Sequence, residues 1–168
     1  PASEASLDRA ATALADRGFV VEVLDDAAAA RARVGDLIPP GASVFTGASE
    51  TLRLSGIEED VNAGGRYDAI RPRALTMDRA REMDDIRRMM STPDVVVASA
   101  HAVTETGSLV LASASGSQLP AFAGGAARSL LIVGAQKVVP DLAAALRRIE
   151  EHCLPLENAA PTHRSLPP

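Results

Sequence analysis

The stretch Asp94-Val95-Val96-Val97-Ala98-Ser99 decides the fold. Its apolar residues follow one another without alternation, which predicts a strand that is buried on both faces. Ser129-Leu130-Leu131-Ile132-Val133 has the same character, and residues 42–46 and 108–112 are two further apolar runs of strand length. Strands of this kind are typical of a parallel sheet that is covered by helices on both faces.

Helical patterns separate these runs. We predict Ser6 as the N-cap of the first helix, Gly18 as its end and Asp141 as the N-cap of the last helix. Within the helix over 76–90, Asp84 and Asp85 are each spaced to pair with Arg88 across one turn. The predicted helices cover residues 7–16, 26–37, 49–54, a short piece from 57, 76–90 and 142–152, and a further strand is predicted over 19–24.

This order of elements predicts an α/β fold: a three-layer sandwich with a mostly parallel sheet. We expect a single domain over residues 1–158, followed by a polar, Pro-rich tail over residues 159–168. Because Pro1 stands where an initiating Met is expected, we also expect the natural protein to extend beyond this sequence.

Net charge, the length of apolar runs and the cysteine count limit which partners and which cellular location we expect. The 168 residues carry a formal net charge of -5, whereas nucleic-acid binding normally needs a clustered basic face, so no nucleic acid is expected. No apolar run reaches the roughly 18 residues that a membrane-spanning helix requires, so no membrane partner is expected. The single cysteine, Cys153, cannot form an internal disulfide, and we expect a cytoplasmic protein. A homodimer is the default expectation for such a domain.

A first candidate site follows the strand over residues 42–46. Gly47 ends that strand and hydroxyl residues open the next helix, a combination in which backbone N–H groups and the helix dipole favour a phosphate or carboxylate. Arg53 adds a positive charge. The alternative is structural: Ser49 caps the helix and Gly47 relieves a tight turn. The candidate ligand-binding residues here are Thr46, Gly47, Ser49, Thr51 and Arg53.

A second candidate site is His101-Ala102-Val103-Thr104-Glu105-Thr106-Gly107-Ser108. It places an imidazole, a carboxylate and several hydroxyls beside the core, and Glu105 is the candidate catalytic residue. The alternative is a polar hairpin in which Glu105 caps backbone N–H groups and Gly107 supplies a positive φ. The candidate ligand-binding residues are His101, Thr104, Thr106 and Gly107, with Lys137 after a later strand.

Metal binding has little support in the sequence. The histidines and Cys153 show no recognised ligand spacing, so we predict no metal and no iron–sulfur cluster held by this chain.

Three segments carry a resemblance to a known family. They are residues 46–57, Thr104-Glu105-Thr106-Gly107-Ser108-Leu109-Val110-Leu111, and Val138-Val139-Pro140-Asp141-Leu142. Together, and in this order, they resemble the LUD-domain family of the lactate-utilisation protein C type, over about residues 42–158. The resemblance implies a fold like that of the phosphosugar isomerase and CoA-transferase superfamily. It also implies a role in oxidising L-lactate to pyruvate, with companion proteins that carry iron–sulfur clusters.

Three functions are compatible with these observations. The favoured one is a component of lactate utilisation that binds a small carboxylate or phosphorylated metabolite and works with iron–sulfur oxidoreductase subunits. The second is an independent enzyme that acts on an acyl-CoA or sugar phosphate through Glu105, because Thr104-Glu105-Thr106-Gly107 is similar to the glutamate-bearing stretch of some CoA-transferases. The third is a non-catalytic interaction subunit. The first two require the turns at Gly47 and His101 to share one hollow.

Overall fold

A computed structural model describes residues 2–113 and 115–159. Its contacts group into two compact units. Within the described residues, the central unit comprises 24–99, 113 and 115–132, and the terminal unit comprises 2–23, 100–112 and 133–159. A single domain over residues 1–158 stays a prediction, and the predicted tail, apart from Ala159, lies outside the described residues.

The central unit is built on a parallel sheet. Its strands are β1 (Ser43–Thr46), β2 (Asp68–Ala69), β3 (Val95–Ala98) and β6 (Arg128–Leu131), in the order β2-β1-β3-β6. Every neighbouring pair in this sheet is parallel. The valine run at 95–97 forms the fully buried β3 between two neighbours, as its lack of alternation predicted.

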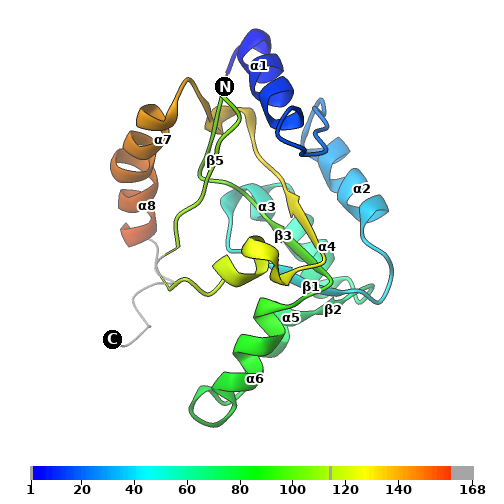
Figure 1. The fold of residues 1–168 in the computed structure, drawn as a ribbon. Coiled ribbons are helices and arrows are strands. Elements are labelled where there is room, and N and C mark those ends of the chain that lie inside the picture. The colour runs from blue at the N-terminus through cyan, green and yellow to red at the C-terminus, as the bar shows by residue number, and fades with distance from the viewer. Residues whose placement is uncertain (1, 114, 160–168) are drawn as a thin grey trace. The chain divides into compact units, whose positions relative to one another are not determined.

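Helices cover both faces of this sheet (Figure 1). On one face, α2 (Ala27–Leu37), α3 (Glu50–Leu54) and α4 (Ile57–Ala63) pack on Val95 and Val97. On the other face, α5 (Ile70–Thr76), α6 (Arg79–Ser91) and the π-helical turn Ala121–Gly125 pack around Val96. Successive side chains of a strand point to opposite faces, so one apolar run serves both layers. The predicted α/β sandwich is confirmed.

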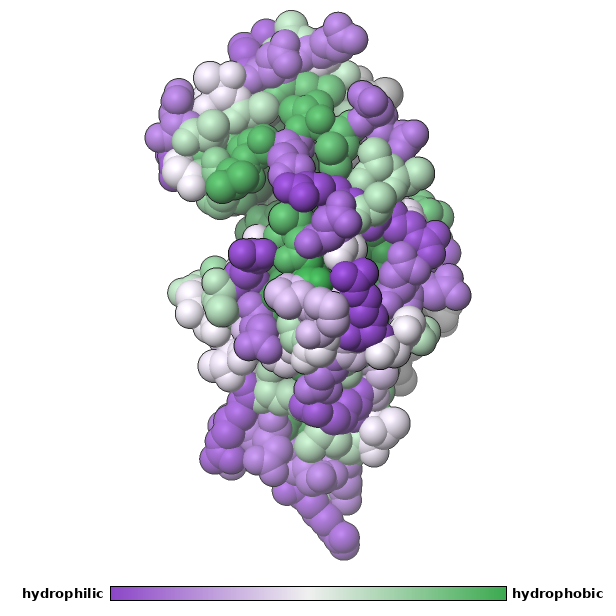
Figure 2. Space-filling view, turned by 90° about the vertical axis from the view of Figure 1, so that its right-hand side faces the viewer, coloured by the Kyte–Doolittle hydropathy of each residue, from purple (hydrophilic) through white to green (hydrophobic). Residues whose placement is uncertain are grey.

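Helix α6 confirms the predicted helix over 76–90 and corrects its details. Its N-cap is Asp78, and Glu82 has non-helical dihedral angles. Asp85 pairs with Arg88 as predicted, but Asp84 pairs with Arg87, because residues three apart are also neighbours on a helix surface. Hydrophilic side chains predominate at the lower end of the face that Figure 2 shows, and Met83 of α6 is an exposed apolar exception.

The terminal unit contains a three-stranded sheet. Strand β4 (Ala102–Thr104) pairs antiparallel with β5 (Leu109–Val110) and parallel with β7 (Val138–Val139). Helix α1 (Glu4–Ala15) packs Ala10 on this sheet, in a small core with Ala100 and Val103. The remaining elements are a 3₁₀ turn (Ala135–Lys137), α7 (Leu142–Arg148), a π-helical turn (Ile149–Cys153) and α8 (Leu154–Ala159).

Three local predictions were wrong. The run 19–24 forms no strand: Gly18 ends α1 in a left-handed conformation with the Phe19 N–H bonded to the Leu14 carbonyl, and the following Val20 is 95% exposed. Apolar and β-branched residues form a strand only where a neighbouring strand supplies the hydrogen bonds. The N-cap of α1 is Ser3, not Ser6, because Ser3 Oγ accepts the Ser6 N–H. The runs 108–112 and 129–133 form strands as predicted, but they are half-buried or exposed instead of buried on both faces, since β5 and β6 are edge strands.

The last predicted helix begins where expected and ends later. Asp141 caps α7 by accepting the Ala144 N–H, as predicted. The chain remains helical through the π-helical turn and α8 to Ala159 instead of ending near His152. No helix within the described residues is long and apolar enough to cross a lipid bilayer.

Candidate functional site

Strand β1 ends in a buried polar position. Thr46 is fully buried, and its Oγ1 lies 3.0 Å from Asn62 Oδ1 on α4, to which it donates a hydrogen bond. The next residue, Gly47, donates its N–H to the Val97 carbonyl on β3 at 2.9 Å. Both contacts hold the carboxyl end of β1 against its neighbours, at the edge where parallel sheets place ligands.

The small size of Gly47 suits this tightly packed position. The φ angle of Gly47 is not positive. The alternative in which Gly47 relieves a tight turn therefore does not explain why a glycine stands here. A Cβ at this position would lie 2.9 Å from Gln118 Oε1 and 3.1 Å from Ala98 Cβ. The Gln118 amide therefore lies directly against the backbone of the turn.

Ser49 has a buried hydroxyl without a partner. It occupies the N-cap position of α3, yet its side chain makes no capping hydrogen bond. Its Oγ is buried and has no hydrogen-bond partner among the described residues. The capping role that the sequence offered as an alternative is therefore wrong for the side chain. We call Thr46, Gly47, Ser49, Asn62 and Gln118 the β1 cluster.

The two remaining candidate residues near this turn, Thr51 and Arg53, lie on α3. Arg53 is engaged by Glu50, with 2.7 Å between Arg53 Nη2 and Glu50 Oε2, and both side chains are exposed. This pairing lowers the pKa of Glu50. Thr51 is half-buried within α3. Because α3 has only five residues, few aligned peptide dipoles add to a positive end, so the turn is a weaker anion cradle than the sequence predicted.

The turn after β4 is a tightly bonded hairpin. Thr104 is fully buried, and its Oγ1 accepts the Ser108 N–H at 2.9 Å and lies 2.9 Å from Thr106 Oγ1. Gly107 has a φ of +82°, and a Cβ there would lie 2.6 Å from the Ala13 carbonyl oxygen. The hairpin alternative is thus confirmed for Gly107.

Glu105 is held by α1 rather than by the hairpin backbone. Its carboxylate accepts a 2.7 Å hydrogen bond from Arg9 Nε, and its side chain is 19% exposed. The hydrogen bonds from Arg9 and Ser6 lower the pKa of Glu105, so it is ionised at neutral pH. An ionised carboxylate can attack an electrophile or bind a cation, and it is a poor general acid. In the hairpin alternative, the Glu105 carboxylate accepts hydrogen bonds from backbone N–H groups. In the structure, it accepts them from the side chains of Arg9 and Ser6 instead.

His101, Lys137 and Arg148 form a third group, which we call the basic cluster. Arg148 Nε donates to the His101 carbonyl at 3.0 Å, and the β4–β7 register, with Val103 opposite Val138, places Lys137 opposite the residue after His101. Burial and the charge of Lys137 lower the pKa of His101. Burial and Arg148 likewise lower the pKa of Lys137. The carboxylate of Glu157 acts on the pKa of His101 in the opposite direction. An anion placed here would be attracted by the positive charges of Lys137 and Arg148.

The tautomer of His101 follows from its hydrogen bond. Its Nδ1 lies 3.2 Å from the Ala112 backbone nitrogen and accepts that N–H. In the neutral ring the proton is then on Nε2, which is able to donate to a ligand oxygen.

The structure groups the predicted residues in two sets. Those near β1 belong to the central unit, and those near β4, with Lys137, belong to the terminal unit. That the two turns share one hollow stays a prediction. Sequence reasoning missed Asn62, Gln118 and Arg148, and no local pattern marks them, because each reaches its cluster from a distant part of the chain.

The family model of the LUD domain matches residues 7–164 of this chain. The chain belongs to the LUD-domain family. No curated protein and no solved structure is similar enough to this LUD-domain protein to add to that match. Across residues 2–113 and 115–159, no three His, Cys, Asp or Glu side chains lie close enough together to hold a metal ion.

Proposed function

We propose that this LUD-domain protein is a small-molecule-binding component of L-lactate utilisation, the oxidation of lactate to pyruvate, and that it acts with iron–sulfur partner proteins. The observation that carries the proposal is the family match over residues 7–164, because the LUD family is associated with lactate utilisation. In this proposal the chain binds the metabolite, and the clusters that accept electrons belong to the partners.

The basic cluster is the site that we assign to the carboxylate. Lactate and pyruvate each carry one carboxylate next to a carbon that bears a hydroxyl or keto oxygen. Arg148 uses only its Nε within the described residues, so its terminal N–H groups are available to a carboxylate. The Nε2–H of His101 is suited to the neighbouring oxygen of the ligand.

The β1 cluster is a second place for a polar ligand group. Ser49 Oγ is buried without a partner, and such a hydroxyl costs stability unless something bonds to it. A ligand oxygen would supply that bond. This cluster belongs to the central unit, and we assign the ligand group to it within that unit alone.

Helices α7 and α8 carry a candidate surface for contact with partner proteins. Four leucines of these two successive helices are between 49% and 60% exposed, and patches of exposed apolar side chains often mark contact sites. They are Leu142, Leu146, Leu154 and Leu156.

Two measurements test the proposal. A strain that lacks the gene should grow poorly on L-lactate and normally on other carbon sources. In vitro, calorimetry should detect binding of lactate or pyruvate to the purified protein. The variant Arg148→Gln should bind at least ten times more weakly, because a charge-assisted hydrogen bond contributes about 1.5–3 kcal/mol.

Arg147→Gln is the matched control, since Arg147 is an exposed neighbour on the same helix. Circular dichroism shows whether each variant is folded. Unchanged growth of the deletion strain on lactate would refute the proposed role. Equal weakening by Arg147→Gln and Arg148→Gln would refute the assignment of the site.

A second function rests on Glu105. Because Arg9 and Ser6 keep its carboxylate ionised, it is suited to attack an acyl-CoA: its oxygen bonds to the acyl carbon and the CoA thiolate leaves. Arg9 must then release the attacking oxygen. Incubation with acyl-CoA esters should give free CoA and an acyl adduct on Glu105 by mass spectrometry, and Glu105→Ala should give neither.

A further inference from the structure

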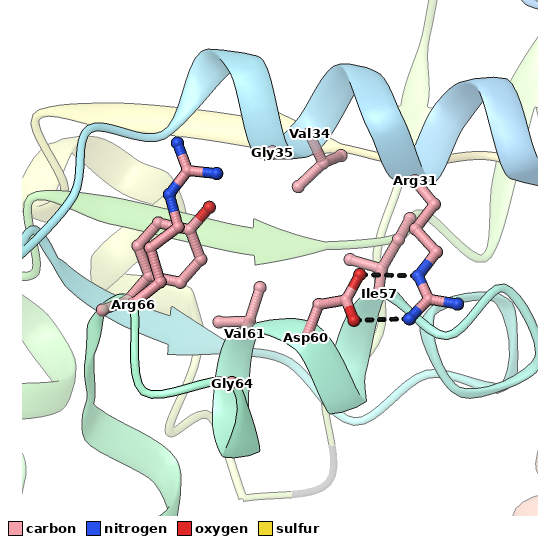
Figure 3. A pocket seen from close by; sticks show the side chains of 9 residues that line it. Arg31, Val34, Gly35, Ile57, Asp60, Val61, Gly64 and Arg66 are labelled. Atoms are coloured by element: carbon pink, nitrogen blue, oxygen red, sulfur yellow. Dashed lines mark hydrogen bonds and ion pairs between the residues drawn. The ribbon is translucent and has the colours of Figure 1, made fainter.

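A hollow of about 230 Å³ lies between α2 and α4 in the central unit (Figure 3). That volume is close to the space of eight water molecules, at ~30 Å³ each. Val34, Ile57 and Val61 supply apolar walls. Gly35 of α2 leaves the space open on one side, because it has no side chain to fill it.

The two arginines that line the hollow differ in whether they have a carboxylate partner. Arg31 bonds both oxygens of Asp60, with 2.6 Å between Arg31 Nε and Asp60 Oδ2, so this pair is neutral. Arg66 lies with its guanidinium carbon 5.5 Å from the centre of the Tyr67 ring. Among the described residues it has no carboxylate partner and no hydrogen-bond acceptor. Arg66 is therefore the one guanidinium of this hollow that is free to bind an anion.

We propose that this hollow binds a short aliphatic monocarboxylate, with its carboxylate on Arg66 and its chain against the valines. The hollow continues into an open groove along α2, which gives the chain room to extend past Ala32. Asp36 also lines that groove, and its negative charge disfavours a second carboxylate on the ligand. The site uses none of the residues assigned to lactate, so it stands apart from the proposed function.

The protein contains its own reporter for this site. Tyr67 is the only tyrosine and there is no tryptophan, so intrinsic emission comes from the ring beneath Arg66. The probe is hexanoate, and hexanamide is the uncharged comparison of the same length. We expect hexanoate to change the tyrosine emission with saturation, and hexanamide to bind at least ten times more weakly.

Two variants test separate parts of the site. Arg66→Gln removes the charge and should weaken hexanoate at least ten-fold. Gly35→Leu adds a side chain toward the hollow, at a position where a Cβ meets only Arg66 Nη1 at an ordinary 3.9 Å, and should abolish saturation. Arg87→Gln is the control, because Arg87 is an exposed arginine of α6. It should bind hexanoate as the wild type does.

Circular dichroism of each variant separates lost binding from lost structure. Absence of a saturable change in the wild type overturns the proposal. Equal affinity for hexanoate and hexanamide, or undiminished affinity in a folded Arg66→Gln or Gly35→Leu protein, also overturns it.

Discussion

Two polar turns follow buried strands in this protein, and they satisfy their polar groups very differently. In the hairpin after β4, Thr104 Oγ1 has two partners and Glu105 is held by Arg9. In the turn after β1, Thr46 has one partner and the buried Ser49 Oγ has none. The residue types in the two turns are similar. The turns differ in how many of their buried polar atoms have a hydrogen-bond partner. A ligand can supply the missing hydrogen bond to a buried atom that has none.

The largest expected effect is at Thr104. Thr104→Val keeps the shape of the side chain but leaves the Ser108 N–H without its acceptor, which should lower the free energy of unfolding by about 1–3 kcal/mol. Thr46→Val removes one bond, to Asn62, and should cost less. Urea denaturation of both variants measures the difference. A larger loss for Thr46→Val would mean that the β1 turn is the better bonded of the two.

Features that neighbouring residues determine were predictable from the sequence. The valine run of β3, the Asp141 cap and the left-handed Gly107 were predictable, because each depends on positions a few residues apart. The hairpin alternative for 101–108 could be named, although not chosen, from the sequence.

The features that the sequence does not predict depend on contacts between residues that are far apart in the chain. Arg9 and Glu105 are 96 positions apart, so no spacing reveals that Glu105 is already engaged. Arg148 joins His101 across 47 positions, and Gln118 reaches Gly47 from another segment. The run 19–24 failed for a similar reason, because strand formation depends on a neighbour that the sequence does not name.

The next effect concerns His101 and pH. Burial and Lys137 lower its pKa below the ordinary 6.5, so the unfolded chain takes up this proton first. The stability that neutral His101 contributes is complete above pH 6.5 and is lost as the pH falls from there toward its lowered pKa. His101→Asn keeps an acceptor for the Ala112 N–H and should not show that loss. Melting temperatures across this range should converge or cross as the pH falls.

Lys137→Met gives an independent check on the cause. Without the positive charge of Lys137, the pKa of His101 rises toward its ordinary value, and the pH-dependent loss becomes smaller. An unchanged pH dependence in this variant would show that Lys137 does not contribute, and that burial and Arg148 lower the pKa.

A smaller effect is expected at Glu105. Hydrogen bonds from Arg9 and Ser6 lower its pKa below the ordinary 4.5, so its stabilising contribution is present above that value and is lost as the pH falls through the lowered pKa. Glu105→Gln should therefore melt below the wild type at pH 7, and the gap should close in acid. Glu50→Gln is the comparison from the other turn. Its ion pair with Arg53 is more exposed, so its gap should be narrower.

The smallest effect, and the one that bears most directly on the comparison, is expected at Ser49. Because its buried Oγ has no partner, Ser49→Ala removes a desolvated hydroxyl without breaking a bond, and the free energy of unfolding should stay the same or rise by up to about 1 kcal/mol. Ser55→Ala is the matched control, since Ser55 Oγ donates to the Leu52 carbonyl at 3.1 Å and its removal should cost about 0.5–1.5 kcal/mol. If Ser49→Ala costs as much as Ser55→Ala, then Ser49 is already satisfied without a ligand, and the two turns do not differ in the way that makes the β1 cluster a binding site.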